Sequence, residues 1–327
     1  MIFQFIQKII FKQWYHKLTY FQLLLPLEYL FILIIKARKN IYKKTWKEDN
    51  NIPVWIVGDI TIGGSGKSPF IIWIARMLEQ RSIKAVIINH AYKSNLDIDA
   101  GICNNNSSAQ VFGDEAVMLA KQTKLPIVVA KSRIKALKYI NENLKETRLI
   151  IFDDGLQHYK VARDKEFIIL NKKRLGNKHC FPVGPLREPL PRLNDVDVII
   201  THNESSSSDM KIVPTAITNI STGKKHGLID LPWFDIHAVA AIADPDRFYK
   251  VLEKYGFNII RHPFRDHHDF TEKDLAFADN LPIVMTTKDA VKCQDYAQDN
   301  LYQLDFDVIV AEEVELEINK LLAEINF

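Results

Sequence analysis

The stretch that decides the fold reads VWIVGDITIGGSGKSP and occupies residues 54–69. Its first four residues, Val54–Val57, are apolar and predict a buried strand. The glycines within residues 63–66 allow backbone N–H groups to approach an anion, because they carry no side chain that would block it. Pro69 suits the first turn of a helix, and the pattern of residues 70–80 predicts that helix. This order of strand, loop and helix predicts a phosphate site, since a helix N-terminus attracts anions.

Two side chains of this loop fit a triphosphate. Lys67 can reach the β- and γ-phosphates, and the Ser68 hydroxyl can ligate Mg²⁺. The usual pattern has its first glycine where this chain has Thr61. The alternative is a glycine-rich turn followed by an ordinary helix, but the order of the elements favours a phosphate loop. We therefore expect the protein to bind a nucleoside triphosphate, and these residues leave the acceptor of the phosphoryl group open.

Composition and charge exclude several classes of protein. The chain has 327 residues, of which 47% are hydrophobic and 25% charged, a globular composition long enough for two domains. The net charge is +3, but residues 1–47 carry nine Lys or Arg and one acid, which leaves −5 for the other residues. We therefore expect neither a nucleic-acid partner nor an obligate protein partner. Cys103, Cys180 and Cys293 lack C-x-x-C spacing, which argues against disulfides or zinc and favours a reducing cytosol.

The N-terminal segment, residues 1–35, is rich in aromatic and aliphatic side chains. Its longest uninterrupted apolar run, Tyr29–Ile35, is too short to cross a bilayer of about 30 Å, and it has no small-residue cleavage site typical of a signal peptide. The mixture of aromatics and lysines is typical of a helix in the membrane interface, with residues 36–47 against anionic headgroups. Two alternatives stay open: an apolar helix pair packed on the protein's own core, and a transmembrane span.

Beyond residue 50 the chain alternates apolar runs with helical patterns, which indicates a parallel sheet with helices on both faces. We expect strands at 54–57, 85–88, 127–129, 149–152, 167–170 and 196–200, and helices at 70–80, 114–122 and 132–145. A second α/β set begins after about residue 230, with strands at 238–242, 283–286 and 308–310 and a helix at 248–255.

The predicted fold is therefore α/β, with a parallel sheet of the P-loop NTPase type. We expect a membrane-associating helical segment at residues 1–47, a phosphate-loop domain at 48–230 and a smaller C-terminal α/β domain at 231–327.

A second group of candidate residues follows the apolar run 149–152. Asp153 and Asp154 end this strand, and ligands bind beyond the carboxyl ends of the strands in such sheets, so these acids and the phosphate loop can converge. An acid in this place holds Mg²⁺ in phosphate-loop enzymes, whereas the alternative is a solvated turn. Gln157 or His158 could orient a substrate or water, or cap the next element.

Three further groups could carry chemistry. Asp114 stands at a predicted helix start, where acids are often partners of the helix dipole. Residues 266–268 (Asp-His-His) could bind a metal only with a further ligand, whereas a His–carboxylate pair could accept a proton from a hydroxyl group. Arg187 and Arg192 lie in a proline-rich loop, where a guanidinium can clamp a phosphate or form surface ion pairs.

These segments, in this order, resemble the tetraacyldisaccharide 4'-kinase family of lipid A biosynthesis. The most specific blocks are DDGLQHY at residues 153–159 and GPLREP at 184–189. The other matching segments are residues 63–69, 113–115, 163–164, 182–183, 266–270 and 285–293. The resemblance runs from the N-terminal apolar segment to about residue 293, and a substituted first glycine of the phosphate loop is usual in this family.

The resemblance implies a phosphate-loop kinase domain, a smaller C-terminal domain and a hinge between them. It implies transfer of the ATP γ-phosphate to the 4'-hydroxyl of a tetraacylated glucosamine disaccharide 1-phosphate, which gives a lipid IVA-type precursor. Asp114 and His267 would form the acid–base pair near that hydroxyl, and which of His267 and His268 assists Asp114 stays open. The residues that would bind ATP are Thr61, Ile62, Gly63, Gly64, Ser65, Gly66, Lys67, Ser68, Gln157 and Arg187. Those that would hold Mg²⁺ are Ser68, Asp153 and Asp154.

The resemblance also implies a location. A lipid acceptor stays in the membrane, so the enzyme would act at the cytoplasmic face of the bacterial inner membrane, held there through its N-terminal segment. Three stretches depart from the family pattern: NHAYK at residues 89–93 in place of SRGYG, KSR at 131–133 in place of DR, and ADP at 243–245 in place of GNP. The first departure removes an expected arginine, so we assign His90 no phosphate role, whereas Arg133 keeps its guanidinium.

Two other functions fit a phosphate loop. A membrane-bound nucleotide-dependent switch or chaperone would hydrolyse nucleotide under the control of a protein partner, but it needs neither Asp114 and His267 nor the GPLREP block. A non-catalytic lipid-binding protein with a decayed loop is disfavoured because Lys67, Ser68 and the two aspartates at 153–154 are intact.

Overall fold

The computed structural model describes residues 14–15, 21–45, 51–90, 94–202, 208–296 and 298–325. The chain forms two compact units and crosses between them four times along its length. Unit 1 consists of residues 1–88, 137–211 and 310–327, and unit 2 of residues 89–136 and 212–309, in each case as far as they are described. The linear domain boundaries expected at residues 48 and 231 stay predictions.

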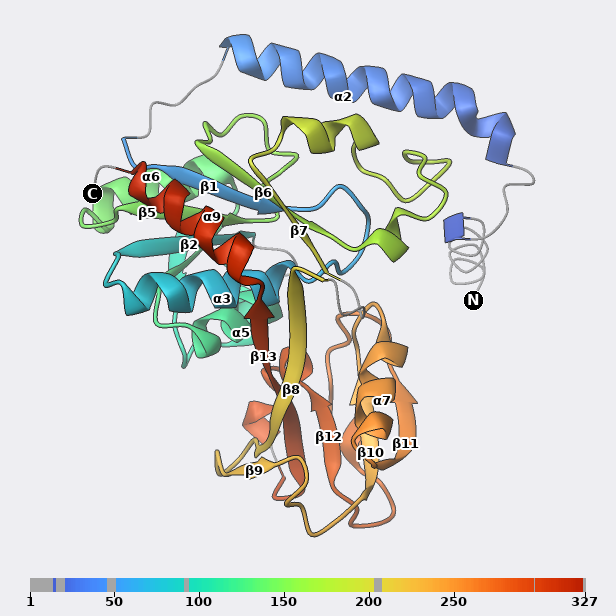
Figure 1. Ribbon diagram of the computed structural model, residues 1–327. Helices are drawn as coiled ribbons and strands as arrows, with labels where there is room; N and C mark the ends of the chain where they lie inside the picture. The colour runs from blue at the N-terminus through green and yellow to red at the C-terminus, as the bar shows by residue number, and fades with distance from the viewer. Residues whose placement is uncertain are drawn as a thin grey trace. The chain divides into compact units, whose positions relative to one another are not determined.

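The core of unit 1 is a parallel sheet whose neighbouring strands follow the order β2-β5-β1-β6-β7 (Figure 1). The strands are β1 (Val54–Gly58), β2 (Ala85–His90), β5 (Leu149–Asp153), β6 (Lys165–Leu170) and β7 (Val198–Thr201). Every residue of β1 and β5 is buried, as expected when helices cover both faces of a parallel sheet. The predicted strands and their parallel arrangement are confirmed.

The helices that follow these strands begin close to their predicted places. Helix α3 (Lys67–Gln80) starts three residues before the predicted Phe70. Pro69 is tolerated in its first turn because an N–H there would have no partner within the helix. Helix α6 (Arg133–Asn143) and the short 3₁₀ helices η2 (Lys172–Leu175) and η3 (Leu190–Asp195) connect further strands.

Helix α9 (Glu312–Ala323), drawn in red in Figure 1, was not predicted from the sequence. Its buried residues are Val314, Ile318 and Leu322, which recur at every fourth position, and acidic residues dominate its first turn. This stripe buries one face, which is typical of a surface helix of a globular domain.

Helix α2 (Leu25–Thr45) follows the short 3₁₀ helix η1 (Phe21–Leu24) and runs along the outside of unit 1 (Figure 1). One of its faces contacts the body: Lys39 Nζ lies 3.0 Å from Asp195 Oδ2, and Lys160 Nζ lies 5.3 Å from the centre of the Tyr42 ring. On another face, η1 and α2 leave apolar side chains exposed at intervals of three, four and seven residues, namely Leu23 of η1 and Leu27, Leu30, Ile34 and Ile41 of α2. We call these five residues the exposed stripe.

Within the described ranges, no helix combines the length and the apolar character needed to cross a membrane. The expectation of membrane contact also covers residues 1–13, 16–20 and 46–47, which lie outside the described residues.

Unit 2 contains a six-stranded sheet with the order β11-β10-β12-β13-β8-β9 (Figure 1). Its strands are β8 (Met210–Asn219), β9 (Lys225–Gly227), β10 (Asp235–Ala240), β11 (Asn258–Pro263), β12 (Ile283–Thr286) and β13 (Leu301–Val310), with helix α7 at Pro245–Lys254. The predicted second α/β set is therefore confirmed, and β8, β9 and β11 are additions to it.

The earlier part of unit 2 supplies an antiparallel pair, β3 (Ala100–Cys103) and β4 (Ile127–Ala130). Between them lie the short helix α4 (Ala109–Phe112) and helix α5 (Asp114–Gln122), whose bounds match the prediction. Helix α8 (Thr287–Ala290) follows β12. These elements place Asp114 at the first position of α5, with Gly113 as its N-cap.

Candidate active site

The loop after β1 is anchored at its start by a buried carboxylate. Asp59 follows the last residue of β1 and accepts two hydrogen bonds from Thr61, from the backbone N–H at 2.8 Å and from the hydroxyl at 2.7 Å. The backbone of the loop also pairs with a second loop: Ile62 N–H donates to Pro185 O at 2.9 Å, and Arg187 N–H donates to Ile60 O at 2.7 Å. The first residues of the phosphate loop are therefore held in place by these hydrogen bonds.

Two glycines of the loop hold conformations that favour glycine. Gly63 has a φ of 108°, and a Cβ there would lie 2.6 Å from Nη1 of Arg174. Gly66 caps helix α3 with a φ of 96°. Side chains at these places would be strained, and at Gly63 one would also displace a cation that lies against the loop. The structure thus keeps the loop backbone bare next to the Arg174 guanidinium.

The hydroxyl of Ser65 gives an independent indication of an anion site. Ser65 is 1% exposed, and its Oγ has no hydrogen-bond partner among the described residues. A buried hydroxyl without a partner is costly unless something satisfies it. A phosphate oxygen bound in the loop would be a suitable acceptor.

Two cations converge on the carboxylate of Asp154. Lys67 Nζ lies 3.5 Å from Asp154 Oδ1, and Arg187 Nη1 lies 3.0 Å from Oδ2 and 3.1 Å from Oδ1. Burial would raise the pKa of Asp154, but the charges of Lys67 and Arg187 outweigh it and lower the pKa to about 2. Burial likewise opposes the charge of Lys67, and the nearby carboxylates of Asp154, Asp59 and Asp153 outweigh it and raise the pKa of its amine. This cluster is therefore fully charged at neutral pH.

Asp153 lies at the end of β5, in register with Val57 at the end of β1. It is buried. Ser68 occupies the second position of α3, directly after Lys67. The expectation that the two aspartates and the phosphate loop converge at the carboxyl ends of the strands is thus met within unit 1.

Gln157 connects the parts of this site. Its Nε2 donates to Asp59 O at 3.0 Å and to Glu188 Oε1 at 3.2 Å, while its Oε1 accepts from Arg187 Nη1 at 3.5 Å. Glu188 is itself buried and paired with Arg192, whose Nε lies 3.2 Å from Glu188 Oε2. Burial raises the pKa of the Glu188 carboxyl, and the charge of Arg192 opposes that change.

A second cluster lies entirely in unit 2. His267 Nδ1 lies 2.8 Å from Asp114 Oδ2, although the two residues are far apart in the sequence. The other Asp114 oxygen, Oδ1, accepts from the backbone N–H of Glu115 at 2.9 Å. His267 itself has a φ of 57°, and its backbone N–H donates to Ala241 O at 3.0 Å, so the turn after β11 fixes this ring against α5.

Lys288 decides which nitrogen of His267 carries the proton. Its Nζ lies 3.3 Å from His267 Nε2 and 3.6 Å from Glu115 Oε1. Burial would lower the pKa of Lys288, but Glu115, Asp114 and Asp266 outweigh it and raise the pKa, so the amine is an ammonium with donors only. Asp266 Oδ1 lies 3.9 Å from Nε2 of His267, too far for a hydrogen bond. We therefore assign Nε2 as the acceptor from Lys288 and Nδ1–H as the donor to Asp114.

Asp114 is consequently a carboxylate rather than an acid. Burial would raise its pKa, whereas the hydrogen bond from His267 and the charges of Lys288 and Lys292 outweigh that effect and lower the pKa. Asp114 thus presents a charged, buried carboxylate beside an imidazole and an ammonium group.

A family model described as tetraacyldisaccharide-1-P 4'-kinase matches residues 20–325 of this chain. The chain belongs to this family. A tetraacyldisaccharide 4'-kinase of Coxiella burnetii (strain RSA 493 / Nine Mile phase I) is 36% identical over 306 residues, covering 93% of this chain and 91% of the relative. One of Francisella novicida is 38% identical over 301 residues, covering 87% and 93%.

The fold of this tetraacyldisaccharide 4'-kinase family member also matches a solved structure. The crystal structure of the "apo" form of LpxK from Aquifex aeolicus in complex with ATP matches it with a TM-score of 0.79 and 27% sequence identity. The match covers 94% of this chain and 100% of that one. The predicted family and fold class are both confirmed.

The geometry resolves two alternatives that the sequence left open. Arg192 is buried and ion-paired with Glu166 and Glu188, so for this residue ion pairing is the correct alternative to phosphate binding. Of the two neighbouring histidines, His267 contacts Asp114, whereas His268 Nε2 lies 3.2 Å from Asp274 Oδ2.

Sequence reasoning missed four residues of these clusters: Asp59, Arg174, Glu188 and Lys288. Asp59 follows an apolar strand just as Asp153 does, so the same signal could have found it. Glu188 and Lys288 lie in the matching segments 184–189 and 285–293, but nothing in those segments indicates their partners, and Arg174 carries no local signal. Residues 91–93, where the chain departs from the family pattern, lie outside the described residues, as do residues 203–207.

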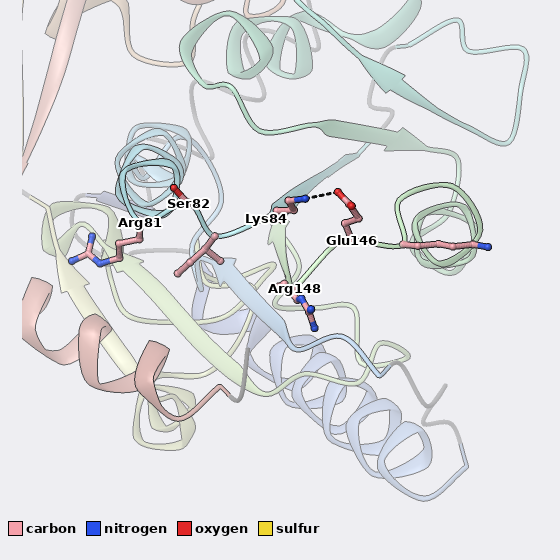
Figure 2. Close-up of a pocket in the computed structure, with 7 residues that line it drawn as sticks. Arg81, Ser82, Lys84, Glu146 and Arg148 are labelled. Atoms are coloured by element: carbon pink, nitrogen blue, oxygen red, sulfur yellow. Dashed lines mark hydrogen bonds and ion pairs between the residues drawn. The ribbon is translucent and has the colours of Figure 1, made fainter.

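A pocket of unit 1 lies away from the phosphate loop. It is lined by Arg81, Ser82, Ile83, Lys84, Lys145, Glu146 and Arg148, and Lys84 forms an ion pair with Glu146 (Figure 2). Lys84 directly precedes β2 and Arg148 directly precedes β5, whereas the phosphate loop follows the carboxyl end of β1. Because the strands are parallel, this pocket lies at the amino ends of the strands and the phosphate loop lies at their carboxyl ends.

Proposed function

We propose that this protein is a kinase that transfers the γ-phosphoryl group of ATP to the 4'-hydroxyl of a tetraacylated glucosamine disaccharide 1-phosphate. The observation that carries the proposal is the convergence of Lys67 and Arg187 on Asp154, next to a glycine loop whose backbone is bare. Membership of the tetraacyldisaccharide-1-P 4'-kinase family gives the acceptor.

In this proposal, unit 1 binds the nucleotide. The backbone N–H groups of residues 63–66, the Lys67 ammonium and the Arg187 guanidinium would contact the phosphates, and Gln157 would hold Arg187 in place. The N–H groups of Thr61 and Ile62 already donate to Asp59 and Pro185, so these two residues would shape the loop. The partnerless hydroxyl of Ser65 supports a phosphate in the loop. Phosphoryl transfer depends mainly on such positioning and charge neutralisation.

We propose that Ser68, Asp153 and Asp154 hold Mg²⁺ together with the nucleotide. Protein sites for Mg²⁺ commonly supply only one or two carboxylates, because substrate phosphates and water complete the shell. Within the described part of the chain, no cluster of three or more His, Cys, Asp or Glu residues is placed to hold a metal by itself. When bound, the ion would neutralise charge on the phosphates.

Residues of unit 2 would activate the acceptor. The 4'-oxygen forms a bond to the γ-phosphorus, while the bond from that phosphorus to the bridging oxygen breaks and ADP leaves. The hydroxyl proton passes to the Asp114 carboxylate. His267 donates to Asp114 and orients it, and Lys288 keeps His267 in the tautomer that can donate. General-base catalysis of this kind contributes about 10²–10⁴-fold.

The test is mass spectrometry of the lipid product. Purified enzyme with ATP, Mg²⁺ and detergent-dispersed acceptor should add one phosphate at the 4'-position. Lys67→Ala and Asp114→Ala should each reduce the rate by about 10²-fold or more. A change confined to an exposed acid, Glu317→Gln, serves as the control and should leave the rate unchanged. Hydrolysis of ATP without phosphorylation of the acceptor would contradict the proposal and favour a nucleotide-dependent switch.

We also propose that the exposed stripe of α2 contacts the cytoplasmic face of the inner membrane. The stripe leaves five aliphatic side chains in water, and the same helix carries Lys36, Arg38, Lys39, Lys43 and Lys44. A helix with an apolar face and several cations is typical of peripheral binding to anionic lipid. A lipid acceptor would be reached from that position.

A further inference from the structure

The single acid of helix α2, Glu28, is an exception among its neighbours. Leu27, Tyr29 and Leu30 are about half exposed or more, yet Glu28 is 7% exposed. Its Oε2 lies 2.8 Å from His179 Nδ1, and its Oε1 accepts the backbone N–H of Cys180, which is also buried. A buried carboxylate that is satisfied by two donors fixes both of them in place, because either donor would be costly to leave unpaired.

The segment that Glu28 contacts is the stem of a loop. Leu186 N–H donates to His179 O at 3.0 Å, and Phe181 N–H donates to Leu186 O at 3.0 Å, so the two ends of the segment 179–186 are hydrogen-bonded to each other. Phe31 of α2 adds an edge contact to the Phe181 ring, with centroids 5.8 Å apart. Helix α2 therefore holds this loop by two polar contacts of Glu28 and one aromatic contact of Phe31.

The other side of the same loop holds the phosphate loop. Leu186 forms an antiparallel bridge with Thr61, Pro185 O accepts from Ile62 N–H at 2.9 Å, and Arg187 N–H donates to Ile60 O at 2.7 Å. Arg187, the residue that follows Leu186, contacts Asp154. The path from the Glu28 carboxylate to the phosphate loop thus runs through Cys180 and Leu186 alone, along paired backbone.

We propose that Glu28 is a positioning residue for the nucleotide site: it locks the loop at 179–187, and through that loop it sets the backbone of Thr61 and Ile62 and the guanidinium of Arg187. The inference rests on the proposed function in assuming that this site binds ATP. As a consequence, α2 has two roles: one face exposes the apolar stripe, and another face holds the phosphate loop in place through the loop at 179–187.

The test compares Glu28→Ala and His179→Ala with a matched control in the full-length, detergent-dispersed protein. The control is the double variant Lys39→Gln/Tyr42→Leu, which removes two other contacts between α2 and the body but none to the loop. Two quantities are measured: ATP affinity by calorimetry, and hydrogen exchange of the amides of Ile62 and Arg187. Thermal unfolding shows that each variant is folded, and Glu28→Gln, which keeps one acceptor oxygen, replaces Glu28→Ala if the latter does not fold.

We expect Glu28→Ala to weaken ATP binding about tenfold and to speed exchange at Ile62 and Arg187. The ATP affinity of Glu28→Gln should be intermediate, and that of the control should stay within about twofold of wild type. The double variant Glu28→Ala/His179→Ala should bind ATP no more weakly than Glu28→Ala. Unchanged exchange and affinity in Glu28→Ala would overturn the inference, as would an equal loss in the control. If wild type fails to bind ATP but exchange still rises in Glu28→Ala, the positioning role holds and the proposed function fails.

Discussion

At the scale of single residues, the central carboxylate of each cluster is kept charged by its partners. Asp154 is charged because Lys67 and Arg187 outweigh the cost of its burial. Asp114 is charged because His267 and Lys288 outweigh the cost of its burial. The same physics therefore prepares one carboxylate among the residues proposed to bind the metal and another for the proposed proton transfer.

The Asp154 contacts predict a specific dependence of stability on pH. The folded-state pKa is about 2, below the value of about 3.9 expected for an unfolded chain. The contribution is therefore complete above about pH 4 and is lost as the pH falls through 2. Because the Asp154 side chain is 36% exposed, solvent screening limits this contribution to about 1 kcal/mol.

Urea unfolding of wild type and Asp154→Asn checks this prediction. The difference in the free energy of unfolding should be about 1 kcal/mol at pH 6 and roughly half of that at pH 3. Glu317→Gln is the control, since this exposed acid is expected to show no such narrowing. A difference that stays constant between pH 6 and pH 3 would show that the ion pairs are not its cause.

At the scale of elements, helix α2 combines a docked face and an exposed stripe. Its length and composition predicted an interfacial helix, but the assignment of faces depends on the rest of unit 1. Lys39 and Tyr42 lie toward the body, whereas Leu27, Leu30 and Ile34 lie away from it. The membrane proposal therefore concerns these exposed residues rather than the whole helix.

Replacing part of the exposed stripe should reduce membrane binding. Burial of one aliphatic side chain contributes about 1.5–3 kcal/mol, so Leu27→Ser/Leu30→Ser/Ile34→Ser should lower partition onto vesicles of phosphatidylglycerol and phosphatidylcholine at least tenfold. Co-sedimentation measures it. The matched control is Ile229→Ser/Ile309→Ser/Leu316→Ser, three exposed residues outside α2, with Ile229 being 81% exposed. Equal losses in both triple variants would contradict a specific role of α2.

At the scale of the whole molecule, the proposed reaction divides its work between the two units. Unit 1 holds Lys67, Asp154 and Arg187, and unit 2 holds Asp114 and His267. Each cluster is assembled from segments that are distant in the sequence but belong to the same unit. Nucleotide binding should therefore be separable from acceptor activation by mutation.

Ligand linkage tests this separation. ATP with Mg²⁺ at about 100 times its dissociation constant should stabilise the wild-type protein by about 2.7 kcal/mol, which is measured as a rise in the unfolding midpoint. Lys67→Ala should lose most of that rise, whereas Asp114→Asn should keep it. Removing Mg²⁺ with EDTA should reduce the stabilisation in both wild type and Asp114→Asn. Loss of the rise in Asp114→Asn would mean that the two roles are not separable.

Much of unit 1 could be predicted because its signals are local. The strand at Val54–Gly58, the glycine loop and helix α3 follow one another in the sequence, and each is encoded by residue type and spacing. Helix α9 was missed, although Val314, Ile318 and Leu322 form a regular stripe, because the acids between them dilute its apolar pattern. Strand β11 was missed as well, since most of its residues are exposed or only partly buried.

The sequence by itself determined the phosphate loop and the Asp153–Asp154 strand end, and the family resemblance implied the pairing of Asp114 with a histidine. These features depend on backbone conformation and strand direction, which short stretches specify. Only the tertiary structure decided that His267 contacts Asp114, that Lys288 sets its tautomer, that Arg192 is an ion-pair partner and that Glu28 is buried against Cys180. Those outcomes depend on contacts between segments that are distant in the sequence. The energies of such contacts cannot be inferred from a short stretch of sequence.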